Sequence, residues 1–135
     1  MNIEDLEKWH FEMTEKACND LLDLVLQGKK KATSSSAAAF RIKGEEIPEE
    51  GSFSVITDWD GSPRCVVRTV RVRRLPYKDI GFDIAVLEGE DSSLASWREN
   101  HEKFFRAEGE ELGYTFTEDM EVIFEEFEVV EVIDQ

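Results

Sequence analysis

The chain has 135 residues, which is enough for one domain with a single core. Hydrophobic residues make up 41% and charged residues 35% of the sequence, a balance that excludes a disordered chain and a low-complexity protein. The formal net charge is -15, and a uniform field of that sign would repel nucleic acid and anionic membranes. The distribution of the charge therefore matters more than its sum.

The acidic residues are concentrated in the C-terminal part of the chain. Residues 1–75 carry 12 basic and 13 acidic side chains, whereas residues 76–135 carry 4 and 18. Two stretches, 24–44 and 61–78, contain no carboxylate. The sequence therefore predicts local basic surfaces in spite of the negative total.

The cysteines and the hydropathy pattern indicate a cytoplasmic protein. Cys18 and Cys65 lie far apart without a CxxC pair, which supports neither a disulfide framework nor a zinc ribbon. No apolar run reaches the roughly 18 residues of a membrane span, and the N-terminus lacks the layout of a signal peptide. We expect both thiols to be reduced and buried, and we expect no membrane partner.

The first predicted element is a helix over about 15–27. Thr14 is a suitable N-cap, apolar residues recur at helical spacing, and Gly28 stands where a left-handed turn ends a helix. The next segment, 29–39, reads KKKATSSSAAA and shows no strand alternation. We expect a loop there that leads into a short helical turn.

A hairpin is predicted next, formed by strands over 53–57 and 65–75. In the second strand Arg68 and Arg74 fall on the valine side of the two-residue period, which a bulge or an exposed strand end explains. A helix from about Ser93 to Glu110 follows.

Aromatic residues at helical spacing in that helix are expected to be core residues, and Gly113 ends it. The last segment, 122–133, alternates apolar residues with glutamate and suits strands with one solvated face. Together the elements predict an α+β domain, with a small mixed β-barrel favoured over an open sheet.

The densest chemical signal is residues 28–36, where a helix end is followed by three lysines and, one residue later, four consecutive hydroxyls. A partly desolvated lysine among other cations has its pKa lowered and can act as a base toward a nearby hydroxyl. The simpler interpretation is a solvated lysine turn with capping serines. Spacing alone favours the simpler interpretation.

The run Gly-Lys-Lys-x-Ala-Thr-Ser-Ser at 28–35 resembles the GxKxxT-type motif of the ASCH superfamily, whose barrel domains are related to PUA domains. The resemblance covers roughly residues 9–130 and includes Glu88-Gly89-Glu90-Asp91 ahead of the later helix. It implies a single ASCH domain over 1–135, with a helical N-terminal segment of about 1–27 and a barrel core of about 28–135, flanking helices, and a cleft for RNA or modified nucleosides.

In small ASCH enzymes that remove the acyl group from acetylcytidine, a lysine, a threonine three residues later and a glutamate before the later helix act together. Matching the motifs places these roles on Lys30, Thr33 and Glu90. The resemblance thus implies an amidohydrolase in which an uncharged Lys30 accepts the proton of Thr33 and Glu90 carries a proton to the leaving amine. Lys31 departs from the threonine that relatives often have, and leaves the choice of substrate open.

Further substrate contacts are expected from polar and basic side chains near the motif and on the hairpin. Ser34 and Ser35 can instead cap a helix. Arg41, Arg68 and Arg71 can instead be strand residues that keep the surface soluble. Glu88, Glu90 and Asp91 can equally be acids that favour a helix N-terminus. The candidate substrate-binding residues are Lys29, Ser34, Ser35, Arg41, Arg68 and Arg71.

Two alternatives to the amidohydrolase stay open at this point. One is a ribonuclease for single-stranded RNA, which needs a base, an acid and cationic stabilisation of the phosphorane. The other is a non-catalytic RNA or nucleotide binder in which Trp59 or Tyr77 stacks on a base. His10 and His101 look isolated, so no metal site is predicted; no cofactor or protein partner is expected either, and the sequence leaves the oligomeric state open.

Overall fold

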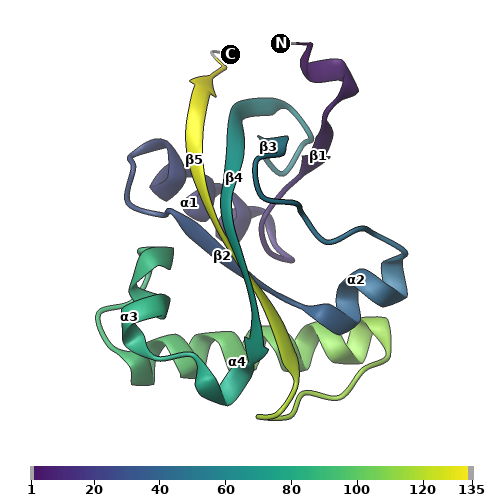
Figure 1. Cartoon of the computed structure of the whole chain (residues 1–135), viewed down its shortest axis with the longest axis vertical. Coiled ribbons are helices and arrows are strands. Elements are labelled where there is room, and N and C mark those ends of the chain that lie inside the picture. The colour runs from purple at the N-terminus through teal and green to yellow at the C-terminus, as the bar shows by residue number, and fades with distance from the viewer. Residues whose placement is uncertain (1, 134–135) are drawn as a thin grey trace.

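The computed structural model describes residues 2–133. It is an α+β fold in which helices cover a curled five-stranded sheet that forms a half-barrel (Figure 1). The strand order is β1-β3-β4-β5-β2, with β1 parallel to β3 and the other neighbours antiparallel. The strands are β1 (Glu7–Trp9), β2 (Ala32–Ser36), β3 (Phe53–Thr57), β4 (Pro63–Pro76) and β5 (Glu121–Val132), and the α-helices are α1 (Glu15–Leu26), α2 (Ala37–Lys43), α3 (Phe82–Ala85) and α4 (Leu94–Leu112).

The predicted first helix and hairpin are confirmed. The side chain of Thr14 accepts a hydrogen bond from the backbone N–H of Ala17 at 3.3 Å and so caps α1. Gly28 has φ +77°, the left-handed conformation expected after a helix end. β3 and β4 form the hairpin, and β1 adds a strand inside the N-terminal segment of about 1–27 that the family resemblance implies is helical.

The prediction of a loop over 29–39 is wrong for its central part. Residues 32–36 form β2, which pairs antiparallel with β5 from Ala32 opposite Glu126 to Ser36 opposite Val122. Only Thr33 among these five residues has a high strand propensity, and the others are alanine and serine, so pairing with the free edge of β5 decides their conformation. The helical turn expected next is present, because Ser36 caps α2 by accepting a hydrogen bond from Ala39 N–H at 3.0 Å.

The pairing of β4 with β5 contains the irregularity that the arginine positions predict. The register shifts between Val66 and Val67 and again between Thr69 and Arg71. Each shift moves the following side chains to the opposite face. Val70, which falls in the second shift, is 42% exposed.

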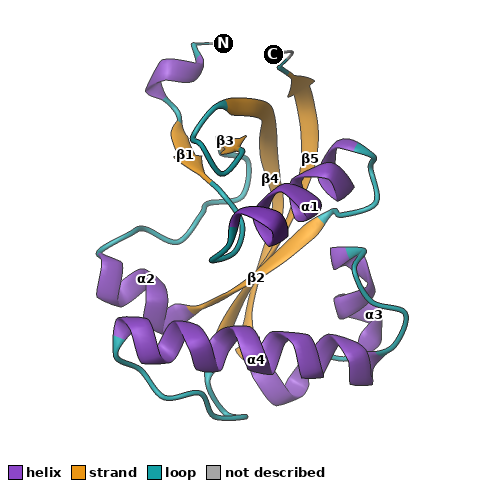
Figure 2. Ribbon diagram, turned by 180° about the vertical axis from the view of Figure 1, so that it is seen from behind, coloured by secondary structure: helices purple, strands orange, loops and turns teal. Residues whose placement is uncertain are grey.

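Two hydrophobic clusters hold the helices to the sheet. Figure 2 shows α1 and α4 on the same face of the sheet, with β2 passing between them. On the buried face of α1, Leu22 and Val25 pack in one cluster with Ile56 and Val67 of the sheet. Along α4, Trp97 and Phe105 are fully buried, as the aromatic spacing predicts, and belong to a cluster with Tyr77, Ile80, Ala85, Phe116 and Val122.

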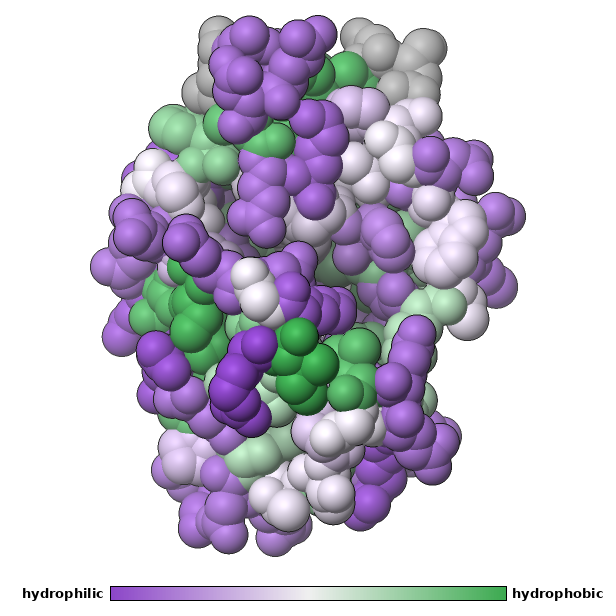
Figure 3. Space-filling model, turned by 90° about the vertical axis from the view of Figure 1, so that its right-hand side faces the viewer, coloured by the Kyte–Doolittle hydropathy of each residue, from purple (hydrophilic) through white to green (hydrophobic). Residues whose placement is uncertain are grey.

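Cys18 and Cys65 are both buried and unpaired, as predicted. Among the residues that the structure describes, no helix has the length and apolar character needed to cross a bilayer. The face of the molecule in Figure 3 is mainly hydrophilic, with hydrophobic side chains gathered in its lower half and a hollow near its centre.

The fold makes a stability prediction at α4. Phe105 is fully buried, and its ring lies 6.2 Å from that of Tyr77 and 6.4 Å from that of Phe116. Replacing it with alanine leaves a cavity that the packed rings cannot fill, so Phe105→Ala should lower the free energy of unfolding by about 3–5 kcal/mol in urea denaturation. Val130→Ala is the control, because Val130 is 44% exposed, and it should change that energy by less than about 0.5 kcal/mol. Equal losses for the two variants would contradict the assigned core.

Candidate active site

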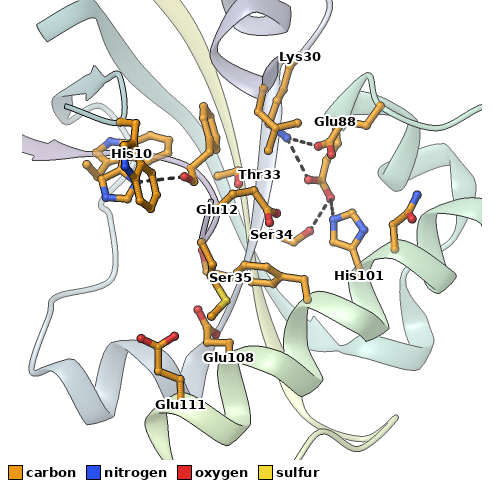
Figure 4. Close-up of a pocket in the computed structure, with 18 of the residues that line it drawn as sticks. His10, Glu12, Lys30, Thr33, Ser34, Ser35, Glu88, His101, Glu108 and Glu111 are labelled. Atoms are coloured by element: carbon orange, nitrogen blue, oxygen red, sulfur yellow. Dashed lines mark hydrogen bonds and ion pairs between the residues drawn. The ribbon is translucent and has the colours of Figure 1, made fainter. Parts of the chain in front are cut away.

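A cavity of about 580 Å³ lies where β2 passes between the N-terminal segment and α4 (Figure 4). This volume falls in the range of about 300–1,000 Å³ that is typical of small-molecule sites. Residues 8–13 form one wall, and the segment before α4 together with α4 itself forms the opposite wall. Of the candidate site residues from the sequence, Lys30, Thr33, Ser34, Ser35 and Glu90 line this cavity.

Lys30 is a buried lysine held at the start of β2. Its backbone N–H donates to the carbonyl of Leu24 at 3.1 Å, so the turn after α1 sets its position. Its side-chain Nζ lies 3.2 Å from Glu88 Oε1 and 2.5 Å from Glu90 Oε2. The ammonium is also 5.3 Å from the centre of the Phe11 ring, which closes its apolar side.

Glu88 joins the elements around the cavity. It is 2% exposed, and besides Lys30 it accepts hydrogen bonds from Ser34 Oγ and from the Trp97 indole, both at 2.7 Å. His101 Nε2 lies 3.1 Å from the same carboxylate, and dashed lines in Figure 4 join Lys30, Ser34 and His101 to it. Three of these four contacts are to Oε2, and the contact with Lys30 is to Oε1. Burial opposes its charge, but Lys30 and His101 outweigh burial and lower its pKa.

His101 is not the isolated histidine that the sequence predicts. Its ring stacks on Trp97 at 4.1 Å, and its Nδ1 lies 2.8 Å from the Trp97 carbonyl oxygen. Because Nδ1 faces a carbonyl and Nε2 faces Glu88, both nitrogens meet acceptors and both favour carrying a proton. Burial lowers the pKa of His101, but the Glu88 carboxylate outweighs it and the net shift is upward.

The expectation of an uncharged Lys30 is wrong. Burial disfavours its ammonium form, but Glu88 and then Glu90 outweigh burial and raise its pKa above the ordinary value. The cationic neighbours expected from the sequence do not act on it in this way, because Lys29 and Lys31 are exposed while Lys30 turns inward. Lys30 is therefore a fixed cation between two carboxylates.

Glu90 is the titratable partner of this cation. Its side chain is 22% exposed and, among the described residues, hydrogen-bonds to Lys30 alone. Burial raises its pKa, Lys30 opposes this, and the nearby charge of Glu88 adds to it. Of the two carboxylates, Glu90 is therefore the one with free acceptor positions and a raised pKa, whereas Glu88 is held by several donors of the protein.

The hydroxyl groups of β2 differ in whether they hydrogen-bond to another side chain. Ser34 is engaged with Glu88, as described above. Thr33 lines the cavity and is half-buried, and its Oγ1 makes no hydrogen bond to another side chain in the part of the chain that the structure describes. Thr33 is thus an available hydroxyl on the wall of the cavity that carries Lys30.

The remaining substrate-binding candidates do not line this cavity. Lys29 and Arg71 are exposed, and Arg41 is an exposed residue beside a smaller cavity of about 280 Å³ next to α2. Arg68 Nε donates to Glu128 at 2.9 Å. Arg73 and Arg74 likewise pair with Glu126 and Glu121 of β5. The basic surface predicted for 61–78 is therefore largely neutralised, because β4 pairs with the most acidic strand.

Glu88, Glu90 and His101 each present one ligand atom within 4.8 Å of the others, the composition of a metal site. This grouping cannot be recognised in the sequence, because the burial of Glu88 and its contact with α4 exist only in the folded chain. Here the Lys30 ammonium already bridges both carboxylates, and the histidine nitrogen that faces them favours a proton. The cluster fits fixed cations of the protein better than a metal ion.

The comparisons with known proteins agree with this architecture. The family model for the ASCH domain matches residues 7–131. The chain belongs to the ASCH domain family. ASCH domains share the PUA-like fold and are generally RNA-binding. No curated protein matches the chain.

Solved structures support the ASCH assignment. The chain is 38% identical to an ASCH domain from Lactobacillus crispatus JV V101, with a TM-score of 0.85 over 93% of this chain and 80% of that one. It is 31% identical to a protein from Enterococcus faecalis V583, with a TM-score of 0.86 over 93% of this chain and 77% of the other. A hypothetical protein of 17% identity and TM-score 0.56, covering 91% of this chain and 99% of its own, shares the fold alone.

Gly89 provides a test of how this ASCH domain assembles its site. It separates Glu88 from Glu90 at φ +70°, and a Cβ there would lie 2.0 Å from the Lys29 carbonyl oxygen. Gly89→Ala should therefore push the Glu88–Glu90 segment away from Lys30 and destabilise the fold by roughly 1–3 kcal/mol, measured by urea denaturation. Gly44→Ala is the matched control, because Gly44 has φ +69° with nothing within 4 Å of its Cβ position. Equal losses at both glycines would show that only backbone strain is at work.

The raised pKa of His101 predicts a pH-dependent stability. A raised folded-state pKa stabilises the fold fully below the unfolded value of about 6.5, and this contribution is lost as pH rises through the folded value. The difference in unfolding free energy between wild type and His101→Gln should therefore be largest near pH 6 and shrink at alkaline pH. Urea titrations at a series of pH values, with the His101 ring followed by NMR, measure it. A difference that does not change with pH would contradict the assignment.

Proposed function

We propose that this ASCH domain hydrolyses the exocyclic amide of an acylated pyrimidine nucleoside of the acetylcytidine type. The observation that carries the proposal is the convergence of Lys30, Thr33 and Glu90 on one cavity, with Lys30 and Glu90 in contact at 2.5 Å. An amine, a hydroxyl and a carboxyl group from separate parts of the chain supply a cation, a nucleophile and a proton carrier. These are the groups that acyl transfer requires.

The charge of the cavity favours an uncharged nucleoside over an RNA chain. Six glutamates line it, against three lysines and two histidines. A polyphosphate backbone would meet net negative potential there. Aromatic rings at the wall suit a base: Trp59 lines the cavity and packs edge-on against His10 at 5.2 Å. Tyr77, the other predicted stacking residue, is unsuitable because it is 3% exposed in the core beside α4.

The proposed reaction begins with Thr33 Oγ attacking the amide carbonyl carbon while its proton passes to the Glu90 carboxylate. The carbon–nitrogen bond then breaks as Glu90 gives that proton to the departing nitrogen, which leaves as the free amine of the nucleoside. Water hydrolyses the resulting ester on Thr33, with Glu90 first accepting the water proton and Thr33 then regaining one. Glu90 thus ends each turnover as it began.

Lys30 acts in this scheme as a cation and not as the base. Negative charge develops on the carbonyl oxygen in the tetrahedral intermediate, and a preorganised cation in a water-poor site stabilises such charge strongly. The buried contact with Glu88 holds the ammonium without a solvent shell. Its charge also favours the ionised form of Glu90, because Lys30 opposes the upward shift that burial imposes on the Glu90 pKa.

Activity measurements test the assignment. Thr33→Val removes the nucleophile at nearly constant volume, and Glu90→Gln removes the proton carrier but keeps its shape. Each should lower kcat for acetylcytidine by about 100-fold or more. The rate is measured by chromatographic separation of the cytidine formed. The matched control is Lys31→Met, which alters an exposed lysine of the same cluster and should retain wild-type rates.

A trapped intermediate would identify the nucleophile. Wild type quenched with acid during turnover of acetylcytidine should carry an acetyl group on the peptide that contains Thr33, detected by mass spectrometry, and Thr33→Val should carry none. Single-stranded RNA is incubated in parallel with the same variants. RNA cleavage that disappears in Glu90→Gln, together with no turnover of acetylcytidine, would replace this proposal with the ribonuclease alternative.

A further inference from the structure

Glu12 has an unusual backbone conformation. Its φ is +60°, and among the described residues it is the one non-glycine residue with positive φ. A side chain with a Cβ is disfavoured in this left-handed region, so such residues persist where the surrounding structure or a function requires them. Neighbours on both sides hold Glu12 there: Phe11 is buried in the core below α1, and Thr14 caps that helix.

This conformation directs the Glu12 side chain into the cavity. Glu12 lines the cavity wall opposite α4, and Figure 4 shows it pointing inward beside the β2 hydroxyls. It is half-buried, and its carboxyl group interacts electrostatically with Glu90, His101 and Lys30. The strained position therefore places a carboxyl group across the cavity from the catalytic cluster.

Among the described residues, Glu12 is also an acid of the cavity wall that has no partner, as are Glu45 and Glu111 farther along the wall. Glu88 and Glu90 are hydrogen-bonded as described, and Glu108 accepts from Ser36 and from Tyr114 at 3.2 and 2.8 Å. In the part of the chain that the structure describes, the carboxyl group of Glu12 makes neither a hydrogen bond nor an ion pair. A half-buried acid without a partner, held by a strained backbone, has the features of a group that awaits a ligand.

Electrostatics indicates which ligand group it suits. Burial and the charge of Glu90 raise the pKa of Glu12, and His101 and Lys30 oppose this. An added anion would increase the repulsion among these carboxylates, whereas an N–H donor would relieve it by supplying a hydrogen bond to Glu12. The exocyclic amide of an acylated pyrimidine offers such an N–H on the nitrogen next to the scissile carbonyl.

We propose that Glu12 is a specificity-determining residue that accepts a hydrogen bond from the exocyclic amide N–H of the bound pyrimidine. This inference rests on the proposed function. Holding the nitrogen from the wall opposite α4 turns the carbonyl carbon toward Thr33 and Lys30. A site built around that hydrogen bond selects secondary amides and rejects the N-methylated tertiary amide, because the carboxyl group would then be buried without a partner.

Two substitutions separate recognition from backbone strain. Glu12→Gly relieves the left-handed strain and removes the carboxyl group, so the urea midpoint should rise while KM for acetylcytidine increases about tenfold or more. Glu12→Asn also tolerates the left-handed conformation but is one methylene too short, so KM should increase in the same way while the midpoint stays at or above that of wild type. Glu12→Gln keeps an acceptor of the same length and should retain most of the affinity. Glu15→Gln, on the exposed first turn of α1, is the control that should match wild type.

The decisive comparison uses acetylcytidine and its N-methylated analogue, with binding followed by tryptophan fluorescence and turnover measured separately. Wild type should prefer the secondary amide by about tenfold or more, and Glu12→Gly should lose that preference. If wild type hydrolyses acetylcytidine but Glu12→Gly and Glu12→Asn keep its KM and preference, the role of Glu12 is wrong and the proposed function stands. If wild type neither binds nor hydrolyses acetylcytidine, the proposed function fails and this inference fails with it.

Discussion

The contact between Lys30 and Glu88 is the interaction on which the rest of the site depends. Both side chains are 2% exposed, and they come from segments 58 residues apart in sequence. A buried ion pair adds little net stability compared with apolar packing, but removing one partner costs about 3–5 kcal/mol because the other charge remains buried. The pair therefore acts mainly as a constraint: the start of β2, the segment before α4 and the Trp97–His101 face of α4 must meet in one arrangement.

Because of that constraint, the carboxylates of Glu88 and Glu90 have different surroundings. Glu88 is contacted by Lys30, Ser34, Trp97 and His101, so it orders its neighbours. Glu90, two residues later, shares Lys30 but is partly open to the cavity and has a raised pKa. Gly89 permits both positions, because its left-handed conformation and missing Cβ let this segment lie against the Lys29 carbonyl. One buried charge thus sets the electrostatic environment of its neighbour.

The charge pattern of the molecule has a related explanation. β5 carries glutamates that pair with the arginines of β4, so the basic stretch of the hairpin is largely used within the sheet. The cavity is lined by more acidic than basic residues, and the proposed ligand, a nucleoside without phosphates, is compatible both with this lining and with the RNA-binding character of the family. Local pairing, and not the total of -15, decides what this ASCH domain can bind.

The sequence by itself determined the α+β class, the capped helix after Thr14, the hairpin, the aromatic core of α4 and, through the family motif, the positions of Lys30, Thr33 and Glu90. These features depend on local propensity, periodicity and spacing, which a chain carries without its fold. Only the tertiary structure decided that 32–36 is a strand, that Lys30 is charged, that Glu88 and His101 complete the cluster and that Glu12 faces it. Each of these depends on a partner distant in sequence, and burial and electrostatic shifts exist only once such partners meet.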